Sequence, residues 1–154
     1  MSKKNGFTII ELLVTLGIIS IVSFFCIPFV SLLNYQKQDI LLNTTCRELL
    51  GDLRLSQQKS ITEGFIYNVF FNTIENTYMI YSYKDLNSCI YKFKKIPDGI
   101  KFDALRSSYS NNKVSFNSRG KPLPYPCTIS LVNNIGHYMK ITITVGTDYI
   151  SIKK

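Results

Sequence analysis

From Leu12 to Leu33 the sequence contains no charged residue. An α-helix rises ~1.5 Å per residue, so this stretch would measure ~33 Å, enough to cross a hydrocarbon layer of ~30 Å. Lys3 and Lys4 precede it, and positive charge of this kind flanks a membrane segment on its cytoplasmic side. No Ala-x-Ala site follows the run, which argues against an ordinary cleaved secretory signal. We therefore expect a membrane anchor at the amino terminus.

Glu11 stands at the start of this apolar run. An acidic side chain within a membrane segment costs about 2.5 to 3.5 kcal/mol on insertion scales. A buried carboxylate that is paired and hydrogen-bonded is tolerated, whereas an unpaired one is costly. On these grounds alone two interpretations stay open: a boundary residue that reaches the polar interface, or a residue that binds a partner.

The segment Gly6–Leu16 resembles the class III signal of type IV pilins and pseudopilins. A cationic leader ends at Gly6, Phe7 follows, and Glu11 is the fifth residue beyond the expected cut. The resemblance implies cleavage after Gly6 by prepilin peptidase and N-methylation of Phe7. It also implies that Glu11 pairs with the terminal amine of a neighbouring subunit during assembly. Pro28 stands where this superfamily carries a helix-kinking proline, in keeping with the missing amide donor of proline.

The resemblance also divides the chain. Residues 1–6 would be a cleaved leader, residues 7–33 the transmembrane and fibre-core half of a long helix, and residues 34–154 a globular pilin-like head. Removal of the two leader lysines would lower the formal net charge from +8 to +6.

A second amphipathic segment, residues 36–63, continues the helix, which we expect from about Thr8 to Glu63. Apolar residues recur at helical spacing on one face, and these are Leu42, Cys46, Leu49, Leu50, Leu53 and Ile61. The opposite, polar face carries Arg47, Glu48, Asp52, Arg54 and Lys59. Gly64 is a natural residue to end such a helix.

The region 65–152 is predicted to form strands, because aromatic and β-branched residues alternate between turn signals. The expected strands cover 65–71, 77–83, 89–94, 113–117, 128–132, 139–145 and 149–152, and residues 104–112 and 120–126 are expected to be exposed loops. The predicted fold class is α+β, a long helix packed on a small antiparallel sheet or sandwich. Segments 53–64, 114–120, 127–131 and 139–152 are similar to those of H-type pseudopilins and their minor-pilin relatives.

The cysteines and the histidine do not predict catalysis. Cys26 and Cys46 are predicted to be small buried apolar residues. An exported head permits a disulfide between Cys89 and Cys127, and Cys46 is a competing partner for either of them. His137 stands alone in a turn with no nearby carboxylate or cysteine cluster. No serine stands in a nucleophile elbow. We expect neither an enzyme nor a bound metal or cofactor.

The basic surplus, 18 Lys and Arg against 10 Asp and Glu, is spread over the chain, with Lys92, Lys94 and Lys95 as its one internal cluster. A solvated surface explains it better than a nucleic-acid site. We therefore expect a minor pilin or pseudopilin that is assembled into, initiates or caps a type IV pilus or a secretion or competence pseudopilus. The alternative is a pilus-tip module that binds DNA or another ligand for competence or adhesion.

The expected partners are other pilins through the amino-terminal helix, prepilin peptidase, the cytoplasmic membrane and the platform protein of the assembly machine. DNA is the less favoured partner. The expected location is the cytoplasmic membrane, crossed once with the head outside, and then a fibre at the cell surface or across the wall.

Overall fold

The computed structural model of the chain describes residues 8–84, 87–109, 111–123, 126–144 and 149–153, without the side chains of residues 26–32, 84 and 87. The chain divides into two compact units, residues 1–37 and 38–154. One helix, α1 (Ile9–Glu63), begins in the first unit and ends in the second. The prediction of one long helix is confirmed to within a residue at its start.

In the first unit the large apolar side chains of α1 that the structure describes are solvent-exposed, between 47% at Leu33 and 82% at Ile9. No helical stretch within the described residues is long and apolar enough to cross a membrane. The membrane span expected over residues 7–33 includes residue 7 and the side chains of 26–32, which lie outside the description. The kink expected at Pro28 falls within the same range, whose side chains the structure does not describe, and stays a prediction.

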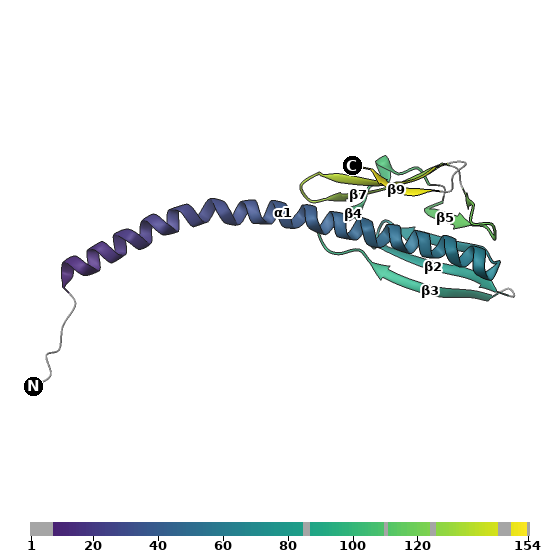
Figure 1. The fold of residues 1–154 in the computed structure, drawn as a ribbon, viewed down its shortest axis with the longest axis horizontal. Coiled ribbons are helices and arrows are strands. Elements are labelled where there is room, and N and C mark those ends of the chain that lie inside the picture. Colours follow the sequence, from purple (N-terminus) through teal and green to yellow (C-terminus); the bar gives the residue numbers. More distant parts are fainter. Residues whose placement is uncertain (1–7, 85–86, 110, 124–125, 145–148, 154) are drawn as a thin grey trace, which may run out of the picture. The chain divides into compact units, whose positions relative to one another are not determined.

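Within the described residues, nine strands form two antiparallel sheets that flank the second-unit part of α1 (Figure 1). The five-stranded sheet has the order β3 (Asn87–Lys95), β2 (Thr77–Lys84), β1 (Tyr67–Asn72), β5 (Lys113–Phe116), β6 (Pro122–Leu123). The four-stranded sheet has the order β4 (Ile100–Phe102), β7 (Cys127–Asn133), β8 (Tyr138–Ile143), β9 (Ile150–Lys153). One hydrophobic core joins the helix to both sheets, which confirms the α+β class.

The predicted helix stripe is only partly correct. Leu42, Cys46, Leu49 and Leu53 are at most 2% exposed, whereas Leu50 is half-buried and Ile61 is 55% exposed. Asp52, expected on the polar face, is buried at 7% exposure. With a sheet on each side the helix buries a wider face than one Leu stripe, and that face includes Thr45, Asp52, Ser56 and Ser60. The Ser56 hydroxyl donates to the Asp52 carbonyl at 2.8 Å, which satisfies it without a partner from the sheet.

All seven predicted strands are present, with ends that differ by no more than two residues. Three short elements were missed, namely β4, β6 and the 3₁₀ turn η1 (Ala104–Arg106), because two or three residues carry no readable period. The two expected loops are therefore wrong in part. Residues 104–112 contain η1 and a bridge from Ser108 to Thr128, and Gly120 and Pro122 are buried.

Candidate assembly sites

The start of α1 is closed by a reciprocal pair, Thr8 and Glu11. The Thr8 amide and hydroxyl both donate to Glu11 Oε2 at 2.9 Å, and the Glu11 amide donates to Thr8 Oγ1 at 3.4 Å. This is the Ser/Thr-x-x-Glu capping box, which satisfies amide donors that the first helical turn leaves unpaired. Glu11 is therefore already engaged within its own chain. Gly6 and Phe7, the predicted cleavage and methylation residues, lie outside the described residues.

In the second unit, a carboxylate near the start of its helical segment binds the turn between β7 and β8. Asp39 Oδ1 lies 2.8 Å from His137 Nδ1 and accepts a hydrogen bond from Asn133 Nδ2 at 3.0 Å. Asn133 Oδ1 in turn accepts from the amides of Ile135 and His137. The expectation that His137 has no carboxylate nearby is wrong. Sequence reasoning missed it because Asp39 is 98 residues away and no local signal links the two.

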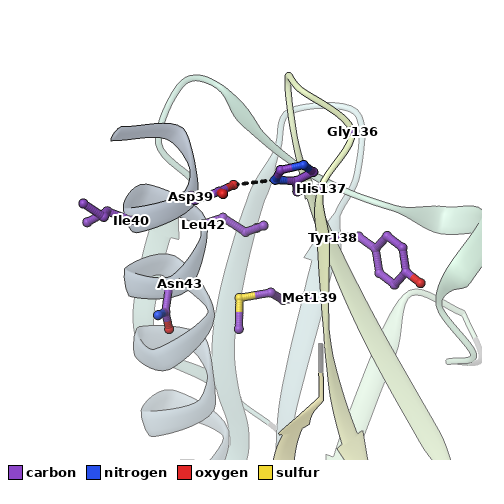
Figure 2. A pocket seen from close by; sticks show the side chains of 8 residues that line it. All are labelled: Asp39, Ile40, Leu42, Asn43, Gly136, His137, Tyr138 and Met139. Carbon is purple, nitrogen blue, oxygen red and sulfur yellow. Dashed lines mark hydrogen bonds and ion pairs between the residues drawn. The ribbon is translucent and has the colours of Figure 1, made fainter. Parts of the chain in front are cut away.

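A cavity of ≈ 530 Å³ lies beside this contact, between α1 and β8. Leu42 and Met139 point into it from the two elements, and Asp39 and His137 meet at its end (Figure 2). The Tyr138 ring points away from the helix, toward the other face of the sheet (Figure 2). The lining is largely apolar and suits an apolar side chain better than a polar substrate.

An ionic group centred on the buried Asp52 joins α1 to the five-stranded sheet. Asp52 accepts hydrogen bonds from the Tyr78 hydroxyl at 2.5 Å and from Lys92 Nζ at 2.6 Å. Burial, together with the adjacent Asp52 carboxylate, raises the pKa of Tyr78 far above its usual range, so the phenol stays protonated and donates. A second pair, Lys94 and Glu48 at 2.6 Å, lies one helical turn away and is more exposed. Two of the three clustered lysines therefore hold the sheet to the helix.

The disulfide that an exported head permits between Cys89 and Cys127 is not formed in the structure, where both thiols are free. Cys89 is exposed on β3 of one sheet, whereas Cys127 is fully buried at the start of β7 in the other. Cys46 is buried as expected, and burial raises the pKa of both Cys46 and Cys127 to about 12. Cys26 is among the side chains outside the description.

Within the described residues, no group of three or more His, Cys, Asp and Glu side chains could hold a metal ion. The contacts found in the second unit join one element of the head to another. They include the Asp39–His137 contact and the Asp52–Lys92 pair, each between α1 and a strand or turn of the head.

Comparisons with known proteins concern the amino-terminal motif and the fold. Residues 1–26 match the prokaryotic N-terminal methylation motif. No curated protein sequence matches the chain. A structure of the minor pseudopilin EpsH from the type 2 secretion system of Vibrio cholerae is similar, with a TM-score of 0.60 at 11% identity, over 73% of this chain and 95% of that one. A second crystal structure of EpsH gives a TM-score of 0.58 at 10% identity, over 75% and 94% of the two chains. At this identity the likeness shows the fold.

Proposed function

We propose that this chain, which has the amino-terminal motif and the fold of the type IV pilin and pseudopilin superfamily, is a minor structural subunit of a pilus or pseudopilus. One observation carries the proposal. The amino-terminal methylation motif and a fold similar to that of a minor pseudopilin occur in the same chain, and one helix, Ile9–Glu63, runs from the first to the second. The match to a minor pseudopilin from a secretion system favours a low-copy subunit that initiates or caps the fibre.

The proposed maturation starts in the cytoplasmic membrane. Prepilin peptidase cuts after Gly6, and the new amino group at Phe7 is methylated. The cut removes Lys3 and Lys4 from the chain and leaves a cationic amine one residue before Thr8. The capping box of Thr8 and Glu11 would then lie beside this positive charge.

Glu11 is proposed as the residue that selects correct docking. Both hydrogen bonds from Thr8 use Oε2, and Oε1 has no hydrogen-bond partner among the described residues. That oxygen can accept a bond from the amine of a neighbouring subunit while the capping box stays closed. An unpaired carboxylate in an apolar fibre core is costly, so the pair rewards correct docking over misdocking.

The other partners follow from the same proposal. The apolar side chains of residues 9–25 are exposed in the isolated chain, and contact with lipid and then with the helices of other subunits would cover them. The platform protein of the assembly machine would move the subunit from the membrane into the fibre. The head would lie outside the cytoplasmic membrane throughout.

Two substitutions at Glu11 test the assembly role. Glu11→Val removes both the capping bonds and the anion, whereas Glu11→Gln keeps a hydrogen-bond acceptor for Thr8 and removes only the charge. Both chains should be inserted and cut, which the loss of the leader mass reports. Both should be depleted from sheared fibre fractions if the charge pairs with an amine. Normal incorporation of Glu11→Gln would refute the ion pair.

The cleavage site is tested separately with a bulky residue at position 6. Gly6→Leu should keep the full-length mass, because the peptidase is expected to need a small residue before the cut. A processed product from this variant would show that the cut lies elsewhere.

A further inference from the structure

The outer face of the four-stranded sheet, the side turned away from the core, carries four cations, two of which lie against one aromatic ring. Arg106 Cζ lies 4.6 Å and Lys140 Nζ 5.2 Å from the centre of the Tyr138 ring. Lys153 on β9 pairs with Lys140 on β8. Lys101 on β4 pairs with Val132 on β7, and Val132 pairs with Tyr138 on β8, so Lys101 and Tyr138 lie in one row across the sheet. We call Lys101, Arg106, Tyr138, Lys140 and Lys153 the β8 patch.

The charges of the β8 patch are poorly balanced. Arg106 pairs with Asp103 at 2.6 Å, and Asp103 is itself only 8% exposed. Lys101, Lys140 and Lys153 have no ion pair with any residue in the described part of the chain. By contrast, the lysines of the other sheet at positions 92 and 94 are each neutralised by a helix carboxylate. The β8 patch therefore holds three lysines without a counter-ion among the described residues, beside an arginine that has one.

The facing pair Lys140 and Lys153 is unfavourable in the isolated chain. Like charges directly opposite each other in an antiparallel sheet destabilise it. Proteins break such local rules mainly at functional sites, so the pair marks this face as a candidate binding surface. Next to Lys140 in the same row is Ser130, which is fully buried. Its Oγ has no hydrogen-bond partner among the described residues. Because Ser130 is fully buried, only the charged donors of this row are open to a partner.

We propose that the β8 patch is a docking surface for a carboxylate-rich segment on the head of another fibre subunit, an inference that rests on the proposed structural role. Carboxylates would lie between Lys140 and Lys153 and beside Arg106, and Tyr138, which is 39% exposed, would supply the apolar contact. Tyr and Arg are the residue types that dominate protein–protein hot spots. Two of the cations, Arg106 and Lys140, lie against the Tyr138 ring, which favours a protein partner that offers both carboxylates and an apolar contact.

The binding test uses the full-length chain in detergent micelles and a fluorescein-labelled hexaglutamate peptide, with hexaglutamine as the uncharged control. Anisotropy should rise with hexaglutamate, weaken with added salt, and stay flat with hexaglutamine. The variant Lys140→Gln/Lys153→Gln should bind about tenfold more weakly, as expected for the loss of two surface charge pairs. The matched control Lys113→Gln/Lys121→Gln removes the same charge from the start of β5 and the residue before β6, and it should bind as the parent chain does.

Three results would overturn the proposal. Equal weakening by both double variants would show that net charge alone attracts the peptide. Tighter binding of a labelled DNA duplex, lost in the same β8 patch variant, would make this a phosphate-polymer surface. No binding of hexaglutamate at low salt would remove the site. Folding is checked by the melting temperature, which should not fall in Lys140→Gln/Lys153→Gln because a repulsion is relieved.

A cellular arm separates this inference from the proposed function. A chain with Lys140→Glu/Lys153→Glu should still lose its leader, yet be depleted from fibres relative to the parent chain. Normal incorporation would contradict the docking role even if the peptide binds. If the parent chain itself is neither cut nor incorporated, the proposed function fails, while the peptide measurement stands on its own.

Discussion

His137 Nδ1 lies 2.8 Å from Asp39 Oδ1, so the turn between β7 and β8 is joined to α1 by residues 98 positions apart in the chain. Both side chains are open to solvent, at 60% and 51% exposure. Asn133 strengthens the contact, since its side chain donates to Asp39 and accepts from two amides of the turn. The contact therefore places the turn against the helix without contributing a large share of the stability.

Replacement of Asp39 tests this contact. Asp39→Ala removes both bonds to the turn, and His137→Ala removes one. Because the pair is exposed, we expect each to lower the free energy of unfolding by no more than about 1 kcal/mol. Amide hydrogen exchange at residues 134–137 should rise more in Asp39→Ala than in His137→Ala. Unchanged exchange in both variants would show that the backbone bonds of the turn suffice.

Asp52 should matter far more to stability. Asp52→Ala leaves the buried Tyr78 hydroxyl without its acceptor and Lys92 without its counter-ion, which should cost about 2 to 4 kcal/mol. Glu48→Ala, at the neighbouring but more exposed pair with Lys94, is the matched control and should cost less than about 1 kcal/mol. Urea unfolding followed by near-ultraviolet circular dichroism measures both. Equal losses would contradict the difference in burial.

The thiols should differ sharply in reactivity. With burial raising the pKa of Cys46 and Cys127 to about 12, only about one part in ten thousand of each is thiolate at pH 8. A raised pKa disfavours the reactive thiolate, and both side chains are 0% exposed. Iodoacetamide at pH 8 should therefore label the exposed Cys89 and leave these two unlabelled until the chain is unfolded.

Peptide mass mapping of the labelled chain identifies each site. It also tests the pairing of the cysteines, because a chain unfolded without reductant should take up label at Cys89 and Cys127 if both are free. Failure of both to react, reversed by reductant, would restore the disulfide that the structure lacks.

Gly120 and Gly51 offer opposite outcomes for the same substitution. Gly120 has φ +74°, and a Cβ there would come within 2.6 Å of Ile61 Cδ1. Gly120→Ala should destabilise the head by about 1 to 2 kcal/mol, since the left-handed backbone is strained and the isoleucine must move. Gly51→Ala lies on an exposed helix surface with nothing within 4 Å and should stabilise by about 0.5 to 1 kcal/mol. Thermal unfolding of the two variants should shift in opposite directions.

Local patterns predicted much of the fold. Helical spacing and Gly64 placed the long helix and its end, and Gly64 adopts the expected left-handed conformation at φ 73°. Period-two alternation located the seven longer strands. The short β4 and β6 were missed because their pairing, and not their own residues, makes them strands. The amino-terminal methylation motif is also local, since it lies in the contiguous residues 1–26.

What the sequence determined by itself is what neighbouring residues can specify: the amino-terminal signal, the helix, most strands and the α+β class. Tertiary structure alone decided which side chains meet. It buried Asp52 against Tyr78 and Lys92, brought Asp39 to His137, and left Cys89 and Cys127 apart. The physical reason is that such contacts depend on sheet order and on the rotation of the helix between two sheets, which no local period encodes. The cations of the β8 patch likewise come from four separate stretches of chain and gather only because the strands pair as they do.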